Sequence, residues 1–222
     1  MQKISTRLKR ADELTANIWE FEFDGAAEYA PGQFFLLEVD EVTSRAYSVA
    51  AAGKMQFCVK LIEDGKGSDL LRSLKVGDEV SWKGPMGHFT LGEPDGDEIF
   101  VATGVGIAPF MTMLEVLFER GFEREITLYF GVRDESELFY MDRLKAWEAE
   151  HSNFRVVTCL SRSGDKKRVT DELRDLEVDG GTDVFICGNG HMVKEVKAMM
   201  EEKGLPKEKV HFELFTPATN PA

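Results

Sequence analysis

A tetrapeptide in the first half of the chain combines three side chains suited to a phosphorylated aromatic ligand. It reads Arg45-Ala46-Tyr47-Ser48. Arg45 can bind a phosphate through paired hydrogen bonds, Tyr47 can lie against a flat heterocycle, and Ser48 offers a small hydrogen-bond donor. Strand alternation places Arg45 and Tyr47 on one face and Ser48 on the other. A ligand that contacts all three residues must therefore wrap around the strand or its end. By itself, the tetrapeptide also fits an ordinary strand with an exposed arginine and a half-buried tyrosine.

Two glycine-containing loops of the first half allow a ligand to approach the backbone closely. Residues 64–70 read Asp-Gly-Lys-Gly-Ser-Asp-Leu. We expect Ser68 to be the N-cap of a helix whose bare N–H groups and positive dipole end create an anion site suited to pyrophosphate. A glycine turn before a capped helix is also common without a ligand. Residues 84–89, Gly-Pro-Met-Gly-His-Phe, form a second sharp turn.

A glycine-rich segment of the second half follows a predicted strand. Residues 101–110 read Val-Ala-Thr-Gly-Val-Gly-Ile-Ala-Pro-Phe. The glycines permit a tight turn, and Pro109 suits the first turn of the helix that follows. A doubly wound fold carries its nucleotide-phosphate loop at this position, although the GxGxxG fingerprint is absent.

Two further segments end predicted strands of the second half. Residues 187–190 read Cys-Gly-Asn-Gly, where a lone thiol is more often a packed apolar side chain than a catalyst. Residues 211–215 read His-Phe-Glu-Leu-Phe. Glu213 and Phe215 are two residues apart and therefore share one face of the strand.

The first half has the pattern of a small antiparallel barrel or sandwich. Apolar residues alternate or form short β-rich runs separated by turn residues. These runs predict strands at 17–23, 33–39, 46–49, 55–61 and 79–82, with one helix at 68–74.

The second half alternates buried strands with helices. Strands are predicted at 99–102, 126–130, 154–160, 184–187 and 210–214, and helices at 109–120, 140–150, 170–176 and 191–203. This order is typical of a parallel sheet with helices on both faces, whose ligand crevice lies at the carboxyl ends of the strands. A polar segment at 92–98 marks the boundary. We therefore predict a β-barrel domain, residues 1–95, followed by an α/β doubly wound parallel-sheet domain, residues 96–222.

Composition and charge exclude several classes of protein. The chain has 222 residues, 43% hydrophobic and 30% charged, with 40 acidic against 27 basic side chains and a net charge of −13. Such a chain repels nucleic acid and anionic lipid unless it carries a local basic patch. Its three scattered cysteines suit neither a disulfide framework nor a four-thiolate cluster, so we expect no metal centre and a reducing, cytoplasmic compartment. We expect neither a secretion signal nor a membrane span, because the apolar run at 99–114 is short and broken.

Together these motifs resemble the ferredoxin–NADP reductase family of flavoprotein reductases. The resemblance covers roughly residues 3–216, with the motifs in the family's order. The tetrapeptide at 45–48 is similar to the family's RxYS flavin motif, residues 65–68 to its flavin-pyrophosphate loop, and residues 84–89 to its GPxGxF turn. Residues 103–109 resemble its GTGIAP nucleotide loop, with Val105 at a position more often occupied by threonine. Residues 187–190 resemble its CGxG segment.

The resemblance implies a flavin site in the first domain. Tyr47, next to Ala46, would stack on the isoalloxazine ring, and Ser48 would reach its N5 edge. Arg45 would pair with the flavin pyrophosphate, aided by Gly67 and Ser68. The family majority favours FAD over FMN.

The resemblance also implies a nicotinamide-nucleotide site in the second domain. The loop would line the NAD(P)H pyrophosphate with Thr103, Gly104, Val105, Gly106 and Pro109. Cys187, followed by Gly188, would lie beside the nicotinamide C4. Glu213 would serve a proton path, and the ring of Phe215 would cover the flavin. Ser48, Cys187 and Glu213 are therefore the catalytic candidates.

A basic loop favours NADPH over NADH as the reductant. Residues 162–168 contain four basic side chains in an acidic protein and follow a predicted strand. In NADP-using relatives, a Ser-Arg pair here and a later basic residue hold the 2′-phosphate, which assigns that role to Ser161, Arg162 and Arg168. A solvated surface loop is the alternative.

The expected activity is electron transfer from NADPH or NADH through FAD to a separate carrier protein, such as ferredoxin or flavodoxin, or to a reductase-dependent oxygenase. A non-catalytic nucleotide-binding or electron-transfer subunit, and a reductase that releases free reduced flavin, are the alternatives. An acidic carrier would need a basic patch, for which Lys3, Arg7, Lys9 and Arg10 are candidates, although such residues also suit a solvated strand.

Overall fold

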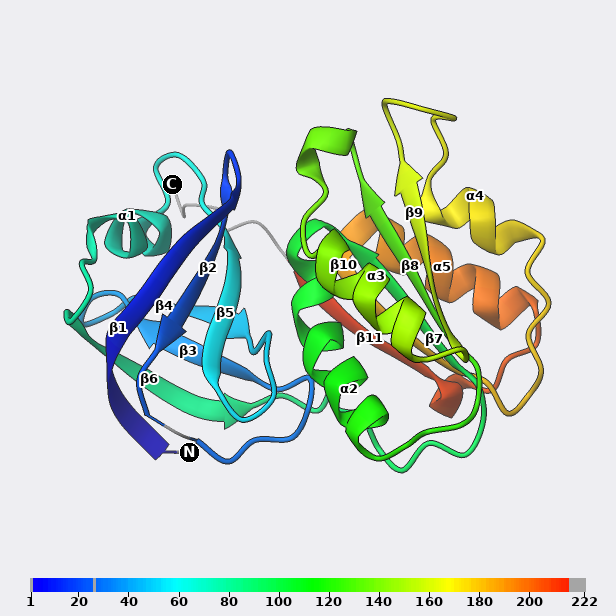
Figure 1. The fold of residues 1–222 in the computed structure, drawn as a ribbon, viewed down its shortest axis with the longest axis horizontal. Helices are drawn as coiled ribbons and strands as arrows, with labels where there is room; N and C mark the ends of the chain where they lie inside the picture. The colour runs from blue at the N-terminus through cyan, green and yellow to red at the C-terminus, as the bar shows by residue number, and fades with distance from the viewer. Residues whose placement is uncertain (1, 26, 216–222) are drawn as a thin grey trace. The chain divides into compact units, whose positions relative to one another are not determined.

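The computed structural model describes residues 2–25 and 27–215. The chain divides into two compact units (Figure 1). Unit 1 comprises residues 1–91 and 108–120, and unit 2 comprises residues 92–107 and 121–222. We describe each unit separately. The segment 108–120 thus belongs to the same compact unit as the first half of the chain.

Unit 1 is built on a six-stranded antiparallel sheet with the order β4-β3-β6-β1-β2-β5. The strands are β1 Gln2–Thr15, β2 Ile18–Phe23, β3 Phe34–Glu38, β4 Ser44–Ser48, β5 Met55–Lys60 and β6 Glu79–Met86. Its two helices are α1 Lys66–Ser73 and α2 Ala108–Glu119.

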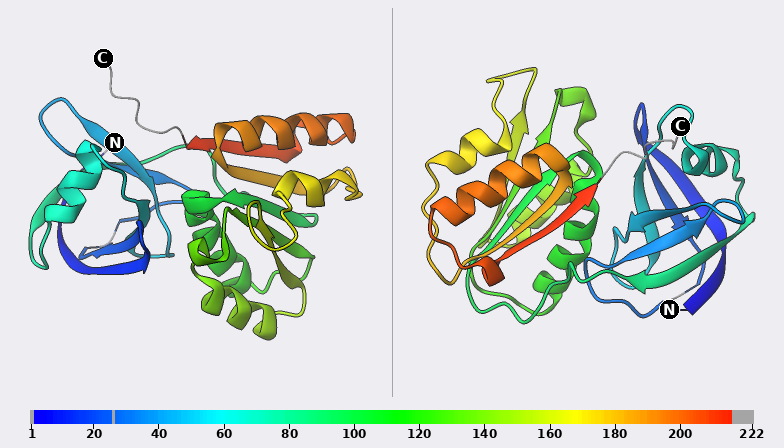
Figure 2. Two further views of the ribbon diagram at one scale, coloured as in Figure 1. Left: turned by 90° about the horizontal axis from the view of Figure 1, so that it is seen from above. Right: turned by 180° about the vertical axis from the view of Figure 1, so that it is seen from behind.

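The two edges of this sheet meet and close it into a barrel. Val49, directly after β4, forms an antiparallel bridge with Phe57 of β5. The N–H of Ala50 donates to the carbonyl of Gln56 at 2.8 Å. The strands curl around a common interior (Figures 1 and 2). Closure pairs backbone groups that an open edge would leave exposed, so the predicted barrel is confirmed.

Strand alternation fills the barrel with aromatic side chains. In β3, Phe35 and Leu37 are fully buried while their neighbours are half-buried. The rings of Phe57 and Trp82 stack with centroids 4.3 Å apart. The Trp82 indole N–H donates to Thr6 Oγ1 at 3.1 Å, which satisfies the polar group that its burial removes from water.

Unit 2 contains a five-stranded parallel sheet with the order β11-β10-β7-β8-β9. The strands are β7 Glu98–Thr103, β8 Ile126–Val132, β9 Phe154–Leu160, β10 Asp183–Asn189 and β11 Val210–Phe215. The helices are α3 Met141–Glu150, α4 Val169–Arg174 and α5 Gly190–Glu202, with 3-10 turns at Gly104–Ile107, Glu135–Glu137 and Lys207–Lys209.

Helices cover both faces of the parallel sheet. α4 and α5 lie on one face and α3 on the other (Figure 2). The core beneath α4 and α5 contains Val101, Tyr129 and Ile186 from the strands and Leu173 and Val196 from the helices. The predicted fold class, an antiparallel barrel followed by a doubly wound parallel sheet, is confirmed.

One local prediction is wrong. Ser68 is not the N-cap of α1, because the helix begins at Lys66 after an extended Gly65. The Ser68 side chain instead accepts a hydrogen bond from the N–H of Ile62 at 3.0 Å and thereby closes the preceding loop. Two glycines flank Lys66 and obscured the helix start in the sequence, since glycine is a poor helix former.

Candidate cofactor sites

The arginine and tyrosine of the RAYS segment lie against the glycine loop before α1. A Cβ atom at Gly67 would lie 2.6 Å from the Tyr47 hydroxyl oxygen and 3.0 Å from Arg45 Cγ. Arg45 and Tyr47 therefore share the face of β4 that meets the start of α1. The sequence motifs are about twenty residues apart, and the barrel brings them into contact.

Tyr47 has the environment of a ring held in place by its neighbours. It is half-buried, and its ring meets Trp82 edge-on with centroids 6.3 Å apart. Burial raises the pKa of Tyr47 to about 12, opposed by the nearby Arg45 charge. The hydroxyl is therefore protonated at neutral pH and can donate a hydrogen bond. Ala46, between the two, is exposed.

Ser48 ends β4 on the other face of the strand. It is buried, with 5% of its surface exposed, and pairs with Phe34 of β3 in the antiparallel register. Its position is fixed by the ladder, since Val49 N–H donates to the Gln33 carbonyl at 3.1 Å. The Gln33 amide also donates to the Gly87 carbonyl at 3.2 Å, which links β3 to the turn at 84–89.

The start of α1 is an anion-compatible site. The first N–H groups of an α-helix have no partner within the helix, and the dipole there is positive. Gly67 lies in this first turn beside Arg45. Lys66 Nζ forms an ion pair with Asp40 Oδ2 at 2.9 Å. The hydrogen bond from this ammonium lowers the pKa of the Asp40 carboxyl well below its usual value. A guanidinium, a helix start and an aromatic ring pack together here because Gly67 has no side chain, and these groups fit the pyrophosphate and ring of FAD.

In unit 2, the parallel register brings the predicted nucleotide residues to one edge of the sheet. Thr103 pairs with Gly131, Gly131 with Cys159, Ala102 with Cys187, and Cys187 with Glu213. These pairs lie near the carboxyl ends of β7 to β11, where a doubly wound sheet binds its ligand.

Two glycine loops pack directly against each other at this edge. A Cβ at Gly106 would lie 2.4 Å from the Cys187 carbonyl oxygen, and a Cβ at Gly188 would lie 2.1 Å from Thr103 Oγ1. Only glycine fits at either position. Gly104 has a φ of +54° and nothing within 4 Å of its Cβ position, so this part of the backbone is open to a ligand. Such a turn fits a dinucleotide pyrophosphate.

Asn189 is a positioning residue that the sequence reasoning did not single out. Its backbone N–H and side-chain amide both donate to Thr103 Oγ1 at 3.1 Å. Its side-chain oxygen accepts from the N–H of Met192 at 2.9 Å and caps α5. An asparagine between a buried strand and an apolar helical pattern is an N-cap signal that could have identified it.

Cys187 and Glu213 are register partners on β10 and β11. The Cys187 side chain is fully buried. Burial raises the pKa of its thiol well above the usual value, and the Glu213 charge raises it further. The thiol is therefore protonated and suits a packing contact rather than nucleophilic attack. Phe215 ends β11 opposite Asn189 and is half-buried.

The basic loop after β9 presents exposed charge near the carboxyl edge. The N–H of Ser161 donates to the Val132 carbonyl at 3.1 Å, and the N–H of Arg162 to the Arg133 carbonyl at 2.8 Å, which extends the β8–β9 pairing. Arg162 and Arg168 are exposed, and neither guanidinium pairs with a carboxylate of a described residue. Arg168 is the N-cap residue of α4, so the helix positions it.

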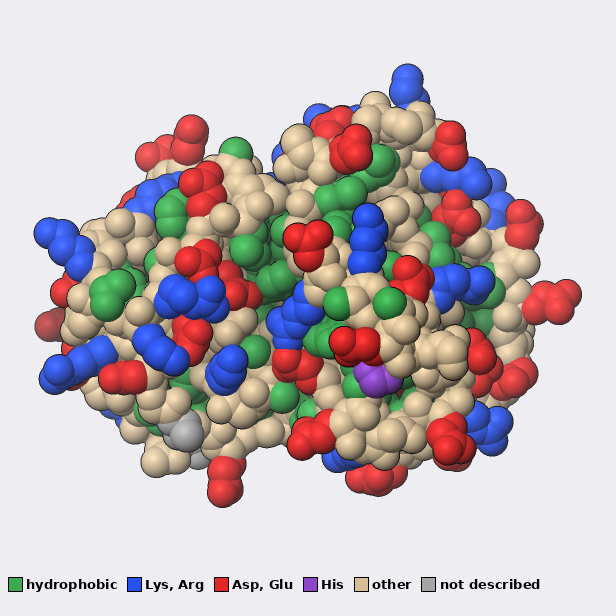
Figure 3. Space-filling model, in the orientation of Figure 1, with side chains coloured by type: hydrophobic (Ala, Val, Ile, Leu, Met, Phe, Trp, Pro, Cys, Tyr) green, Lys and Arg blue, Asp and Glu red, His purple; other side chains and the backbone are tan. Residues whose placement is uncertain are grey.

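The amino-terminal basic residues do not form an unpaired patch. Lys3 pairs with Glu38 at 2.6 Å, Lys9 with Glu22 at 2.6 Å, and Arg7 with Glu79 at 3.6 Å. Arg10 contacts Asp12, Glu20 and Glu22. Carboxylates of β2, β3 and β6, together with Asp12 of β1 itself, thus neutralise the cluster, as expected for a solvated strand face with interspersed acidic and basic side chains (Figure 3).

An antiparallel barrel followed by a parallel sheet with packed glycine loops is the architecture of a flavin- and nicotinamide-dependent oxidoreductase, and the family comparisons show this class. Residues 5–91 match the oxidoreductase FAD-binding domain family, and residues 100–198 match the oxidoreductase NAD-binding domain family. Among known proteins, the chain is 30% identical to ferredoxin–NADP reductase B of Sorangium cellulosum, over 96% of this chain and 98% of that one. The chain belongs to the ferredoxin–NADP reductase family.

Two further comparisons extend this similarity. The reductase component of propane 2-monooxygenase from Rhodococcus jostii is 30% identical over 97% of this chain, which spans only 64% of that relative's length. The structure of a ferredoxin NADP+ reductase from Neisseria gonorrhoeae with bound FAD and NADP is 26% identical, with a TM-score of 0.87, and the match covers 96% of this chain and 99% of that one. In the described residues, no helix is long and apolar enough to cross a membrane.

Proposed function

We propose that this chain binds FAD through unit 1 and NADPH through unit 2 and passes electrons to a separate redox carrier protein, such as a ferredoxin or flavodoxin, or to an oxygenase that depends on a reductase. The contact of Arg45 and Tyr47 with Gly67 is the observation that carries the proposal. It joins a phosphate donor, a ring surface and a helix start in one place.

Different residues of unit 1 would bind different parts of the flavin. Arg45 and the first turn of α1, with Gly67 and Ser68, would hold the pyrophosphate, and Tyr47 and Ala46 would lie along the ring. Ser48, buried at the end of β4, would supply a hydrogen bond to the reacting edge. When bound, FAD accepts two electrons as a hydride from NAD(P)H and can release them singly to a carrier.

The residues of unit 2 would hold the nucleotide and place its reactive ring. Thr103, Gly104, Val105, Gly106 and Pro109 would line the pyrophosphate. Cys187, followed by Gly188, would pack against the nicotinamide as a neutral thiol, and Glu213 beside it would serve proton transfer. No protein nucleophile is needed, because the main requirement of hydride transfer is that the protein holds the two cofactor rings in the correct relative orientation. The assignment of Phe215 to the flavin remains a prediction from the family resemblance.

The exposed charge after β9 supports NADPH over NADH. Ser161, Arg162 and Arg168 would contact the 2′-phosphate that only NADPH carries. The three cysteines are free and buried, which supports a reducing compartment, and we propose the cytoplasm. The net charge of −13 would repel an acidic carrier at long range, so short-range contacts would have to select the acceptor.

Purified chain and an Arg45→Ala variant provide the direct test. We expect the wild type to retain FAD through gel filtration and to lose its yellow colour anaerobically on addition of NADPH. Arg45→Ala should weaken flavin binding by about 1.5–3 kcal/mol, the scale of a charge-assisted hydrogen bond. A colourless wild type that takes up no added FAD would contradict the proposal, as would a variant that retains flavin as tightly as wild type.

A further inference from the structure

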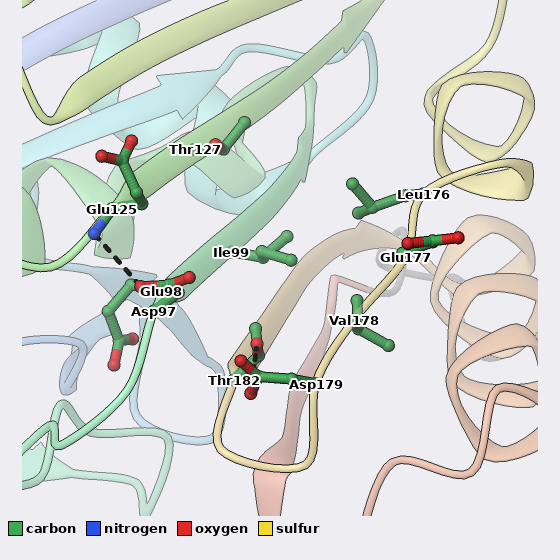
Figure 4. Close-up of a pocket in the computed structure, with 10 residues that line it drawn as sticks. All are labelled: Asp97, Glu98, Ile99, Glu125, Thr127, Leu176, Glu177, Val178, Asp179 and Thr182. Carbon is green, nitrogen blue, oxygen red and sulfur yellow. Dashed lines mark hydrogen bonds between the residues drawn. The ribbon is translucent and has the colours of Figure 1, made fainter.

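The two edges of the parallel sheet offer an anionic ligand opposite chemistry. A pocket at the amino ends of β7 and β8 is lined by the acidic residues Asp97, Glu125, Glu177 and Asp179 (Figure 4). Lysine, arginine and histidine are absent from the described residues that line it. Such a pocket repels a phosphate. At the carboxyl edge, in contrast, hydrogen-bond donors of β7 and β10 meet, and an oxyanion is expected there.

The side-chain amide of Asn189, at this carboxyl edge, has a fixed orientation. Its Oδ1 accepts from the N–H of Met192 at 2.9 Å and caps α5. A backbone N–H can only donate, so the amide oxygen must face Met192 and the amide nitrogen must face away from it. The nitrogen then donates to Thr103 Oγ1 at 3.1 Å. The N-cap of α5 therefore decides which way the amide points.

The hydroxyl oxygen of Thr103 accepts a second hydrogen bond from the same residue. The backbone N–H of Asn189 donates to Thr103 Oγ1, also at 3.1 Å. A hydroxyl has two acceptor lone pairs and one proton. Asn189 uses both lone pairs, and neither of its nitrogens can accept. The proton must therefore point elsewhere, and no described residue accepts it.

Glycines on both neighbouring strands hold the Thr103 side chain in this position. A Cβ at Gly188 would lie 2.1 Å from Thr103 Oγ1, and a Cβ at Gly131 would lie 3.3 Å from Thr103 Cγ2. The hydroxyl thus packs against β10 and the methyl group against β8. Thr103 is half-buried, and the Cβ position of the next residue, Gly104, has nothing within 4 Å. A ligand can therefore reach the loop beside the unused proton.

We propose that Asn189 is a positioning residue that makes Thr103 a fixed hydrogen-bond donor to a phosphate oxygen of the NADPH pyrophosphate. The proposal rests on the nucleotide site assigned to unit 2 above. An ionised phosphate oxygen only accepts, which matches a hydroxyl that can only donate. A freely rotating hydroxyl loses orientational freedom on binding, whereas Asn189 has already fixed this one.

Two substitutions at Asn189 separate the orienting amide from the helix cap, because aspartate and serine are both good N-caps. Asn189→Asp places an acceptor where the amide N–H stood, so the Thr103 proton turns to the carboxylate and is withdrawn from the ligand. Asn189→Ser removes the side-chain N–H without adding charge and leaves the hydroxyl free to rotate. We expect nucleotide affinity to decrease from wild type to Asn189→Ser and further to Asn189→Asp.

Calorimetry of the full chain with NADP+, NAD+ and adenosine 2′-monophosphate tests the proposal. Asn189→Asp and Thr103→Val should each weaken NADP+ binding at least about tenfold. NAD+ should lose the same factor, since both nucleotides carry the pyrophosphate. Adenosine 2′-monophosphate lacks the pyrophosphate, so its Kd should not change. Thr103→Ser keeps the hydroxyl and should bind NADP+ within about threefold of wild type.

A double variant separates loss of the oriented proton from repulsion by the added charge. Thr103→Val has no proton to withdraw, so adding Asn189→Asp to it should weaken NADP+ by less than about a further threefold. If the two single losses multiply in full, the carboxylate repels the pyrophosphate directly and the proposal is overturned. Asn17→Asp, in the exposed turn between β1 and β2, adds the same charge to unit 1 and should match wild type.

The outcomes also separate this inference from the proposed function. A wild type that binds neither NADP+ nor NAD+ would contradict the nucleotide site itself. A wild type that binds NADP+, with Asn189→Asp binding equally well, would overturn only the role of Asn189. Equal losses for adenosine 2′-monophosphate would also overturn it, because the substitution would then disturb the whole sheet edge. The Asn189 variants keep this readout even if Thr103→Val fails to fold.

Discussion

At the scale of single residues, the candidate catalytic side chains are neutral, buried or tied to a strand. Cys187 is a protonated thiol in the core, and Ser48 is a buried hydroxyl at the end of β4. The raised pKa of the Cys187 thiol means that it is not activated as a nucleophile. These residues suit a reaction in which the protein orients the cofactors and supplies hydrogen bonds, and the cofactors exchange electrons.

Ser48→Ala should leave flavin bound and slow its reduction by NADPH by at least about tenfold, or about 1.4 kcal/mol of barrier. The hydroxyl is lost from the expected reacting edge, while Arg45 and Tyr47 are unchanged. Stopped-flow reduction under anaerobic conditions measures the rate. Ser44→Ala, on the same strand, is the matched control and should reduce at the wild-type rate. An unchanged single-turnover rate in Ser48→Ala would refute the placement.

Arg162→Ala should lower kcat/KM for NADPH by roughly 1–3 kcal/mol and leave NADH nearly unaffected. The exposed guanidinium would pair with the 2′-phosphate, which NADH lacks. Steady-state kinetics with both nucleotides measure the ratio. Lys167→Ala is a control in the same loop, because Lys167 pairs with Glu172 at 3.0 Å. Equal losses for both nucleotides, or a wild type that prefers NADH, would show that the loop is only a solvated surface.

At the scale of elements, glycines decide which strands and loops can touch. The turn at 103–106 packs against residues 187–188 because Gly106 and Gly188 leave no Cβ between the two backbones. Gly67 likewise has no Cβ, which lets the start of α1 pack against Arg45 and Tyr47 of β4. A side chain at any of these positions would separate elements that the sites need together.

Gly67→Ala should reduce flavin retention strongly and lower stability only modestly. The added Cβ would lie 2.6 Å from the Tyr47 hydroxyl and 3.0 Å from Arg45 Cγ, so both side chains must move. Alanine suits a helix better than glycine by about 1 kcal/mol, which offsets part of the strain. Flavin content after gel filtration and urea unfolding measure the two effects. Gly92→Ala is the control, since its Cβ would meet nothing within 4 Å. Full flavin retention in Gly67→Ala would contradict the arrangement.

At the scale of the whole molecule, the buried carboxyl of Glu98 makes the free energy of unfolding depend on pH. The pKa of Glu98 is raised from 4.5 to about 8 in the folded chain. The folded state therefore binds more protons than the unfolded state between these values. The contribution of Glu98 to stability is full below about pH 4.5 and is lost as the pH rises through about 8.

Glu98→Gln should therefore gain stability relative to wild type as the pH rises from about 5 to about 8, by up to a few kcal/mol, at about 1.4 kcal/mol per pKa unit. The amide cannot ionise, so it has no charge to desolvate. Urea unfolding of both proteins at several pH values measures the difference, and Glu202→Gln should follow wild type. A difference that is constant with pH would contradict the raised pKa.

The local sequence determined much of this protein. Strand alternation, glycine turns and the change of period near residue 92 predicted both architectures. Five short motifs in order predicted the family, because each depends on neighbouring residues of the chain. The wrong N-cap at Ser68 shows the limit of such signals, since a serine after a glycine can satisfy a loop N–H as well as a helix end.

Only the tertiary structure decided which distant groups meet. The barrel places Gly67 against Arg45 and Tyr47, and the order of its strands sets the carboxylates of Glu22 and Glu38 against Lys9 and Lys3 of β1. The parallel register places Glu213 opposite Cys187 and the buried Glu98 opposite Asp183. A residue's burial and its partners depend on contacts between segments far apart in the chain. Residue type and local period do not encode them, so the order and register of the strands had to be known first.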